Sequence, residues 1–153
     1  MLTIGSAAPA FSLPDQNDKT HGLIDYEGQW VLLYFYPRDD TPGCTKEACG
    51  FRDLWKELQA HNCHVFGVSK DSVASHQKFA DKFGLPFPLL ADESTEVIQA
   101  YGAWQEKSMY GKKYLGIARS SVLIDPDGKV AKVYEKVKPL DHPQDVLHDL
   151  QNQ

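Results

Sequence analysis

The 153-residue sequence contains no apolar run that approaches the ~18 residues of a membrane-spanning helix. It also has no excess of positive charge, because its formal net charge is −5 at pH 7. Nucleic acids and anionic membranes attract surfaces with clustered Lys and Arg, so neither is expected as a partner. The short basic cluster of Lys107, Lys112 and Lys113 is interpreted as a solvated loop.

Cysteine is scarce as well, with three in the chain. An odd number in a chain long enough to bury a core argues against a disulfide framework and favours reduced, reactive or buried thiols. The segment Met1–Gly5 lacks the basic residues and long apolar stretch of a secretory signal, which predicts a cytoplasmic protein. No glycine-rich phosphate loop or dinucleotide motif is present, so no bound cofactor is expected.

Cys63 lies between His61 and His64, a spacing that suggests a metal site. Zinc requires three or four converging ligands, and no Cys-x-x-Cys motif supplies them. We therefore interpret Cys63 as a half-buried structural cysteine, with a metal site as the weaker alternative.

The predicted elements alternate between strands and helices. Apolar runs and turn signals predict strands at residues 31–36, 64–69, 87–90, 120–124 and 129–135. Helical periodicity predicts helices at roughly residues 42–60, 72–83, 94–101 and 142–151. This order is typical of an α/β fold, and in the absence of repeats or long linkers we expect one domain over residues 1–153.

Residues 31–36 and 64–69 are apolar on both faces and are joined by a helix, which predicts a parallel βαβ unit with a right-handed crossover. The segments on either side of Pro126-Asp127-Gly128 are expected to pair as an antiparallel hairpin. The central sheet is therefore predicted to be mixed and flanked by helices. Ligands of open α/β sheets bind beyond the carboxyl ends of the strands, so function is expected after residue 36.

Thr41-Pro42-Gly43-Cys44 lies at that position, between the first of these strands and the following helix. Thr41 suits the N-cap and Pro42 the first helical position, while Gly43 allows a small substrate to approach the backbone. Cys44 then falls in the first turn, where unpaired N–H groups and the helix dipole stabilise an anion. Because the thiolate is the reactive form of cysteine, Cys44 is the candidate nucleophile.

Cys49 follows on the same predicted helix. At 100° per residue it lies about 140° from Cys44, away from the core-facing stripe. The two Cα atoms of an intact helix would be roughly 8 to 9 Å apart, beyond the ~7 Å limit for a disulfide. A bond between them requires the first turns of the helix to unwind, and the alternative role for Cys49 is that of a small core residue.

These residues resemble the peroxiredoxins, whose signature Pro-x-x-x-Thr-x-x-Cys appears here as Pro37, Thr41 and Cys44. The longer string from Tyr36 to Cys49 is similar to the bacterioferritin comigratory protein branch, also called peroxiredoxin Q. The resemblance extends over nearly the whole chain. It implies a thioredoxin-like fold and a peroxidase that reduces hydrogen peroxide and organic hydroperoxides.

The resemblance also implies a role for each site residue. Cys44 would attack the peroxide and Cys49 would resolve the sulfenate as a Cys44–Cys49 disulfide, while Pro37 would shield the thiolate from water. Thr41 and Arg119 would hold the peroxide oxygens. The family further implies recycling by thioredoxin, with glutaredoxin or glutathione as alternatives, and a monomer.

Two other functions stay open at this point. A thiol-disulfide oxidoreductase would use the same order of elements, although such enzymes place both thiols in a Cys-x-x-Cys motif. A redox sensor or holdase would pass its disulfide to a protein client instead of turning over peroxide.

Overall fold

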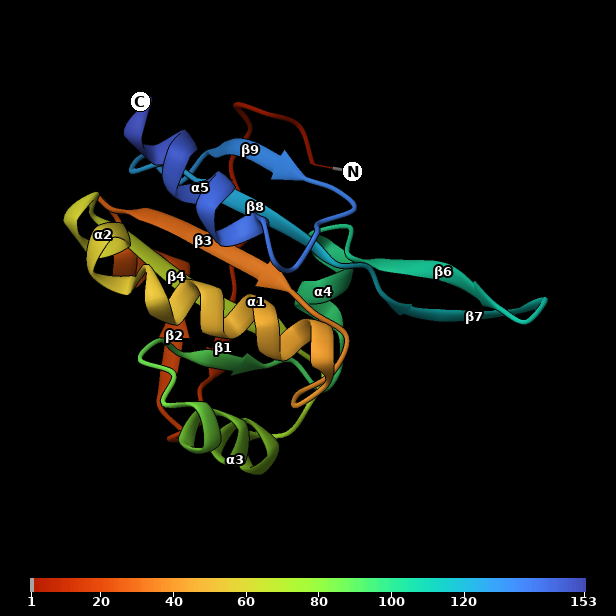
Figure 1. Ribbon diagram of the computed structural model, residues 1–153. Coiled ribbons are helices and arrows are strands. Elements are labelled where there is room, and N and C mark those ends of the chain that lie inside the picture. The colour runs from red at the N-terminus through yellow and green to blue at the C-terminus, as the bar shows by residue number, and fades with distance from the viewer. Residues whose placement is uncertain (1) are drawn as a thin grey trace.

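The computed structural model describes residues 2–153 and contains a central five-stranded sheet in the order β5-β4-β3-β8-β9 (Figure 1). Its strands are β3 (Trp30–Phe35), β4 (Cys63–Ser69), β5 (Leu89–Ala91), β8 (Ser120–Ile124) and β9 (Val130–Tyr134). The helices are α1 (Pro42–Asp53), α2 (Trp55–Ala60), α3 (Val73–Phe83), α4 (Glu96–Ala100) and α5 (His142–Gln151), with a 3-10 turn, η1, at Leu23–Tyr26. This is the mixed, helix-flanked sheet that the sequence predicts.

The pairing of the strands follows the predicted topology. β3 runs parallel to β4, and β4 runs parallel to β5. β8 pairs antiparallel with both β3 and β9. The parallel βαβ unit and the Pro126-Asp127-Gly128 hairpin are therefore confirmed, and β3 is the central strand that leads to the site.

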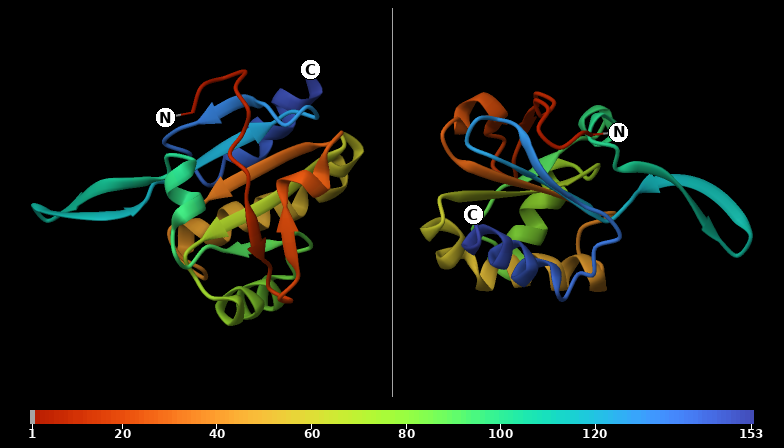
Figure 2. Two further views of the ribbon diagram at one scale, coloured as in Figure 1. Left: turned by 180° about the vertical axis from the view of Figure 1, so that it is seen from behind. Right: turned by 90° about the horizontal axis from the view of Figure 1, so that it is seen from above.

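The two faces of the sheet are covered differently. Alternate β3 side chains Leu32 and Tyr34 pack with α1, α2, α3 and α5 on one face. Val31, Leu33 and Phe35 point to the other face, which is covered by α4 and by segments near the N-terminus (Figure 2). Both clusters consist of buried apolar side chains, and together they hold β3 and the start of α1 in a fixed geometry.

Three expectations about the elements need correction. The helix predicted at residues 42–60 is two helices, because Leu54 leaves the helical conformation between α1 and α2. The basic cluster belongs to a hairpin of β6 (Trp104–Met109) and β7 (Lys112–Ile117), which projects from the body in Figure 1 and is not a loop. A further hairpin of β1 (Ser12–Pro14) and β2 (Thr20–Gly22) has no counterpart among the predicted strands.

Among residues 2–153, no helix is long and apolar enough to cross a membrane.

Candidate active site

The site begins where β3 ends and α1 starts. Pro37 lies half-buried in the bend after the strand, and α1 begins at Pro42, as predicted. Cys44 is in the first turn of α1 with 1% of its surface exposed. The thiol is thus buried at the positive end of a twelve-residue helix.

Thr41 occupies the N-cap position with an extended backbone, but its side chain does not cap the helix. The hydroxyl instead donates a hydrogen bond of 3.0 Å to the carbonyl of Arg38. Thr41 thus holds the N-cap position, as predicted, but does not form a side-chain capping bond. Because this capping bond is absent, the first N–H groups of α1 have no side-chain acceptor, which favours an anion at this end of the helix.

Arg119, directly before β8, is the arginine that reaches the thiol. Its Nη2 atom donates to Cys44 Sγ across 3.5 Å, although the two residues are 75 positions apart in sequence. A Cβ atom added at Gly43 would lie 3.0 Å from Nη2, so Gly43 leaves the space that the guanidinium occupies. Arg52, nearer in sequence, instead donates to the carbonyl of Phe83.

Glu47 is a site residue that sequence reasoning missed. It lies one turn after Cys44 with 1% exposure, and its Oε1 accepts a hydrogen bond of 3.4 Å from Arg119 Nη1. Its Oε2 is buried without a partner. Burial raises the pKa of Glu47 to about 8, with Arg119 acting in the opposite direction. The shift favours the protonated form of the carboxyl group, which leaves the guanidinium charge unneutralised.

Cys49 is half-buried and lies off the core-facing stripe that contains Cys44, Ala48 and Phe51, as predicted. All three cysteines are free thiols, and α1 is continuous from Pro42 to Asp53. The structure therefore corresponds to the reduced form with an intact first turn.

The loop that carries Pro37 is tied to α3 by a buried polar network. Asp39 accepts a hydrogen bond of 2.6 Å from the hydroxyl of Tyr36 and pairs with His76 Nδ1 at 2.7 Å. Its own N–H donates to Asp71. The ligand atoms of Asp39, Asp71 and His76 lie within 4.8 Å of one another, as in a metal site. Because these groups already satisfy one another, the cluster fixes the loop before α1.

Cys63 is distant from this chemistry. It is 1% exposed, so it is fully buried and not half-buried as expected. Burial raises its pKa to about 12, which keeps the thiol protonated and unreactive. The imidazole of His64 forms a hydrogen bond with Gln29, while the Cys63 thiol donates to the backbone carbonyl of His64 across 3.8 Å.

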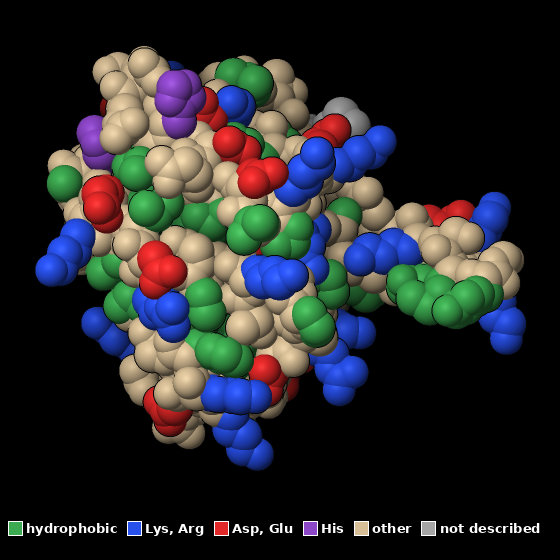
Figure 3. Space-filling model, viewed as in Figure 1, with side chains coloured by type: hydrophobic (Ala, Val, Ile, Leu, Met, Phe, Trp, Pro, Cys, Tyr) green, Lys and Arg blue, Asp and Glu red, His purple; other side chains and the backbone are tan. Residues whose placement is uncertain are grey.

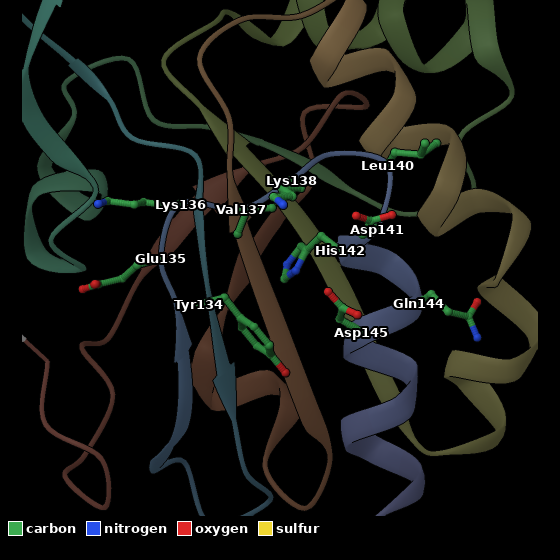
Figure 4. A pocket seen from close by; sticks show the side chains of 10 residues that line it. All are labelled: Tyr134, Glu135, Lys136, Val137, Lys138, Leu140, Asp141, His142, Gln144 and Asp145. Atoms are coloured by element: carbon green, nitrogen blue, oxygen red, sulfur yellow. The ribbon is translucent and has the colours of Figure 1, made fainter.

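A hollow of about 560 Å³ lies beside the loop between β9 and α5 (Figure 4). Buried His142 borders it, is hydrogen-bonded to Ser121, and has a pKa lowered by burial to about 4. The same loop supports the site, because the N–H of Val137 donates to the carbonyl of Arg119. We therefore assign the loop a supporting role behind the guanidinium.

Known proteins resemble this chain in sequence and in fold. The AhpC/TSA family profile matches residues 4–133. The chain belongs to the AhpC/TSA family of peroxiredoxins. It is 48% identical over 146 residues to the putative peroxiredoxin bcp of Coxiella burnetii, covering 95% of this chain and 97% of that protein. It is 42% identical over 151 residues to peroxiredoxin Bcp of Bacillus subtilis, covering 99% and 96% of the two chains.

Solved structures agree with this membership. A structure of the Xanthomonas campestris bacterioferritin comigratory protein, studied for alkyl peroxide reduction, has a TM-score of 0.91 and 38% identity, with 99% of this chain and 97% of that chain covered. A cysteine-to-serine mutant of Xylella fastidiosa PrxQ has a TM-score of 0.95 and 35% identity, with 99% and 97% covered. The resemblance to the peroxiredoxin Q branch is thus confirmed, as are the thioredoxin-like fold and thiol-dependent peroxidase activity, which uses a peroxide and a thiol reductant.

Proposed function

We propose that Cys44 is the residue at which this peroxiredoxin reduces peroxide. The thiolate attacks one peroxide oxygen, the O–O bond breaks, and the other oxygen leaves as water or an alcohol after it takes up a proton. Cys44 is left as a sulfenic acid, oxidised by two electrons. The observation that carries this assignment is the contact of 3.5 Å between Arg119 Nη2 and Cys44 Sγ at the start of α1.

The residues around the thiol bind the peroxide and stabilise the thiolate. Arg119 presents fixed donors and a permanent charge to the thiolate and to the oxygen on which negative charge develops. Thr41 supplies a hydroxyl to the peroxide once that hydroxyl turns from the Arg38 carbonyl. Pro37 excludes water on the strand side of the thiolate.

Glu47 sets the charge that Arg119 offers. While Glu47 is protonated, Arg119 directs a full positive charge at the thiolate. When Glu47 ionises, the guanidinium of Arg119 interacts with the Glu47 carboxylate as well as with the Cys44 thiolate. The reactivity of the thiolate is therefore expected to fall as the pH rises through about 8.

Cys49 resolves the sulfenic acid. Its thiolate attacks Cys44 sulfur, an S–S bond forms, the S–O bond breaks, and the sulfenic oxygen leaves as water after it takes up a proton. Since the two cysteines lie on different sides of an intact α1, the first turns must unwind before the bond forms. This step couples the chemistry to local unfolding of the helix.

Thioredoxin is the proposed reductant, with glutaredoxin as the alternative, and the substrates include hydrogen peroxide and alkyl hydroperoxides of the kind associated with the Xanthomonas campestris relative. The intramolecular resolver allows the chain to work as a monomer, as one domain over residues 1–153. The cytoplasm, where dithiol reductants are maintained, is the proposed location.

Peroxide-dependent turnover with dithiothreitol as reductant tests these roles. Replacement Cys44→Ser is expected to abolish turnover, and Cys49→Ser to preserve the first oxidation but stop disulfide formation. The matched control Cys63→Ser is expected to retain wild-type rates, because that thiol is remote and buried. Full activity of Cys44→Ser would refute the assignment.

A further inference from the structure

The hairpin of β6 and β7, here called the arm, forms a two-stranded sheet of its own that stands away from the body (Figures 1 and 2). Its tip is the turn Tyr110-Gly111, in which both residues have positive φ angles of 52° and 78°. This is the two-residue geometry that suits hairpin twist. The arm is therefore a built element, although it adds little to the core.

The arm exposes an unusual amount of apolar surface. Met109 is 57% exposed, Tyr114 44%, Leu115 60% and Tyr110 98%. These four are more than half of the seven large apolar side chains that are exposed among residues 2–153. Apolar side chains clustered on a projecting element indicate contact with another molecule.

The strand register places two of these side chains, Met109 and Tyr114, on one face with basic residues. Lys107 lies opposite Tyr114, and Met109 lies opposite Lys112. Directly opposed residues of an antiparallel pair share a face, as do alternate residues of one strand. The face formed by Gln105, Lys107, Met109, Lys112 and Tyr114 is called the docking face below.

The docking face is continuous with the active site. At the base of the arm, Gln105 and Lys107 line a hollow of about 390 Å³ together with Arg119, Glu135 and Lys136. Burial and the charge of Arg119 lower the pKa of Lys107, which is consistent with this cationic setting. The docking face therefore leads into a hollow that is lined by Arg119, whose guanidinium contacts Cys44.

The charge of the arm opposes that of the rest of the chain. Residues 104–117 contain three lysines and one glutamate, which gives a net charge of +2. Since the whole chain carries −5, the other residues together carry −7. Figure 3 shows basic side chains both on the arm and at its junction with the body. The docking face thus complements a partner that combines acidic groups with an apolar patch.

We propose that the docking face binds an acidic dithiol protein that reduces the Cys44–Cys49 disulfide. The inference rests on the proposed function, because that disulfide is the group to be reached. One thiolate of the partner attacks a sulfur of the bond, the S–S bond breaks, and a mixed disulfide forms. The second partner thiol then displaces it, so the partner is oxidised to a disulfide and both enzyme thiols are restored.

The test measures turnover with a thioredoxin of net negative charge, regenerated by its reductase, as the concentration of that thioredoxin is varied. Two variants probe the face: the double replacement Met109→Ser with Tyr114→Ser, and the charge reversal Lys112→Glu. Matched controls are Ile24→Ser and Lys129→Glu, which alter an exposed apolar and an exposed basic residue outside the arm. The charge reversal keeps the test valid if the apolar variant fails to fold.

We expect kcat/KM for thioredoxin to fall roughly tenfold in each arm variant, the size typical of an interface anchor. The wild-type value is expected to decrease with added salt, and Lys112→Glu to weaken that dependence. Turnover with dithiothreitol and the rate constant for thiol oxidation by peroxide are expected to match wild type. Both controls are expected to behave as wild type throughout.

Three results would overturn the inference. The first is thioredoxin kinetics within twofold of wild type in both arm variants. The second is slower thiol oxidation by peroxide, which would assign the face to substrate. The third is loss of a wild-type dimer in the variants, which would assign it to a second copy of the chain. Absence of dithiothreitol-supported turnover in the wild type would instead contradict the proposed function and the inference with it.

Discussion

Replacement of Glu47 by glutamine isolates the buried carboxyl group beside Arg119. Glutamine keeps the shape of the side chain and an oxygen that accepts from Arg119, but it cannot ionise. Glu47 has an ordinary pKa of 4.5, and burial raises it to about 8 in the folded protein. The folded state therefore binds this proton more tightly than the unfolded state.

The sign of the stability change follows from that difference. The contribution of Glu47 to the free energy of unfolding is complete below pH 4.5 and is lost as pH rises toward 8. The pKa rises by about 3.5 units and each unit is worth about 1.36 kcal/mol, so the full loss is about 5 kcal/mol. Glu47→Gln removes this loss, and the variant is expected to be more stable than wild type by up to about 5 kcal/mol above pH 8 and to lie within about 1 kcal/mol of it near pH 5.

Urea unfolding of the reduced protein at intervals from pH 5 to pH 9 measures the effect. Other titrating groups cancel in the difference between variant and wild type. Glu57→Gln on α2 is the matched control, because Glu57 is exposed and replacement of a surface side chain is expected to change the free energy of unfolding little. A difference between Glu47→Gln and wild type that stays constant with pH would refute the reasoning.

Three further predictions follow from individual contacts. Gly43→Ala places a Cβ atom 3.0 Å from the Arg119 guanidinium, and the displaced charge is expected to slow thiol oxidation by peroxide about tenfold, measured by stopped-flow fluorescence. An unchanged rate would contradict this. Gly50→Ala brings a Cβ atom to 2.7 Å from Pro143 and is expected to destabilise the packing of α1 on α5 by about 1 to 3 kcal/mol in thermal unfolding. Cys63, with a pKa of about 12, is expected to resist alkylation by iodoacetamide in the native protein at pH 8, and rapid labelling would disprove its burial.

The positions of the two helical cysteines could be predicted because helical periodicity is local. A stripe that repeats every 3.6 residues places Cys44 in the core and Cys49 outside it, and the structure agrees. The break at Leu54 could not be predicted, since the same apolar stripe runs through both helices. Periodicity reports which face is buried but not whether the backbone continues.

Contacts between residues far apart in the chain were harder to predict from the sequence. The placement of Arg119 beside Cys44 required the family resemblance, because no local pattern links residues 75 positions apart. Glu47 escaped notice because an acidic residue within a helix is usually exposed. The arm also escaped notice, because its strands are largely exposed and do not alternate apolar with polar residues, the signal that identifies half-buried strands.

The central claim is that Cys44 is oxidised by peroxide and resolved by Cys49. It is tested most directly by mixing fully reduced protein with one equivalent of hydrogen peroxide, following the loss of free thiols, and mapping the product by peptide mass spectrometry. The account predicts rapid loss of two thiols, recovered as a Cys44–Cys49 disulfide, with Cys63 still reduced. Slow loss spread over all three cysteines would contradict it.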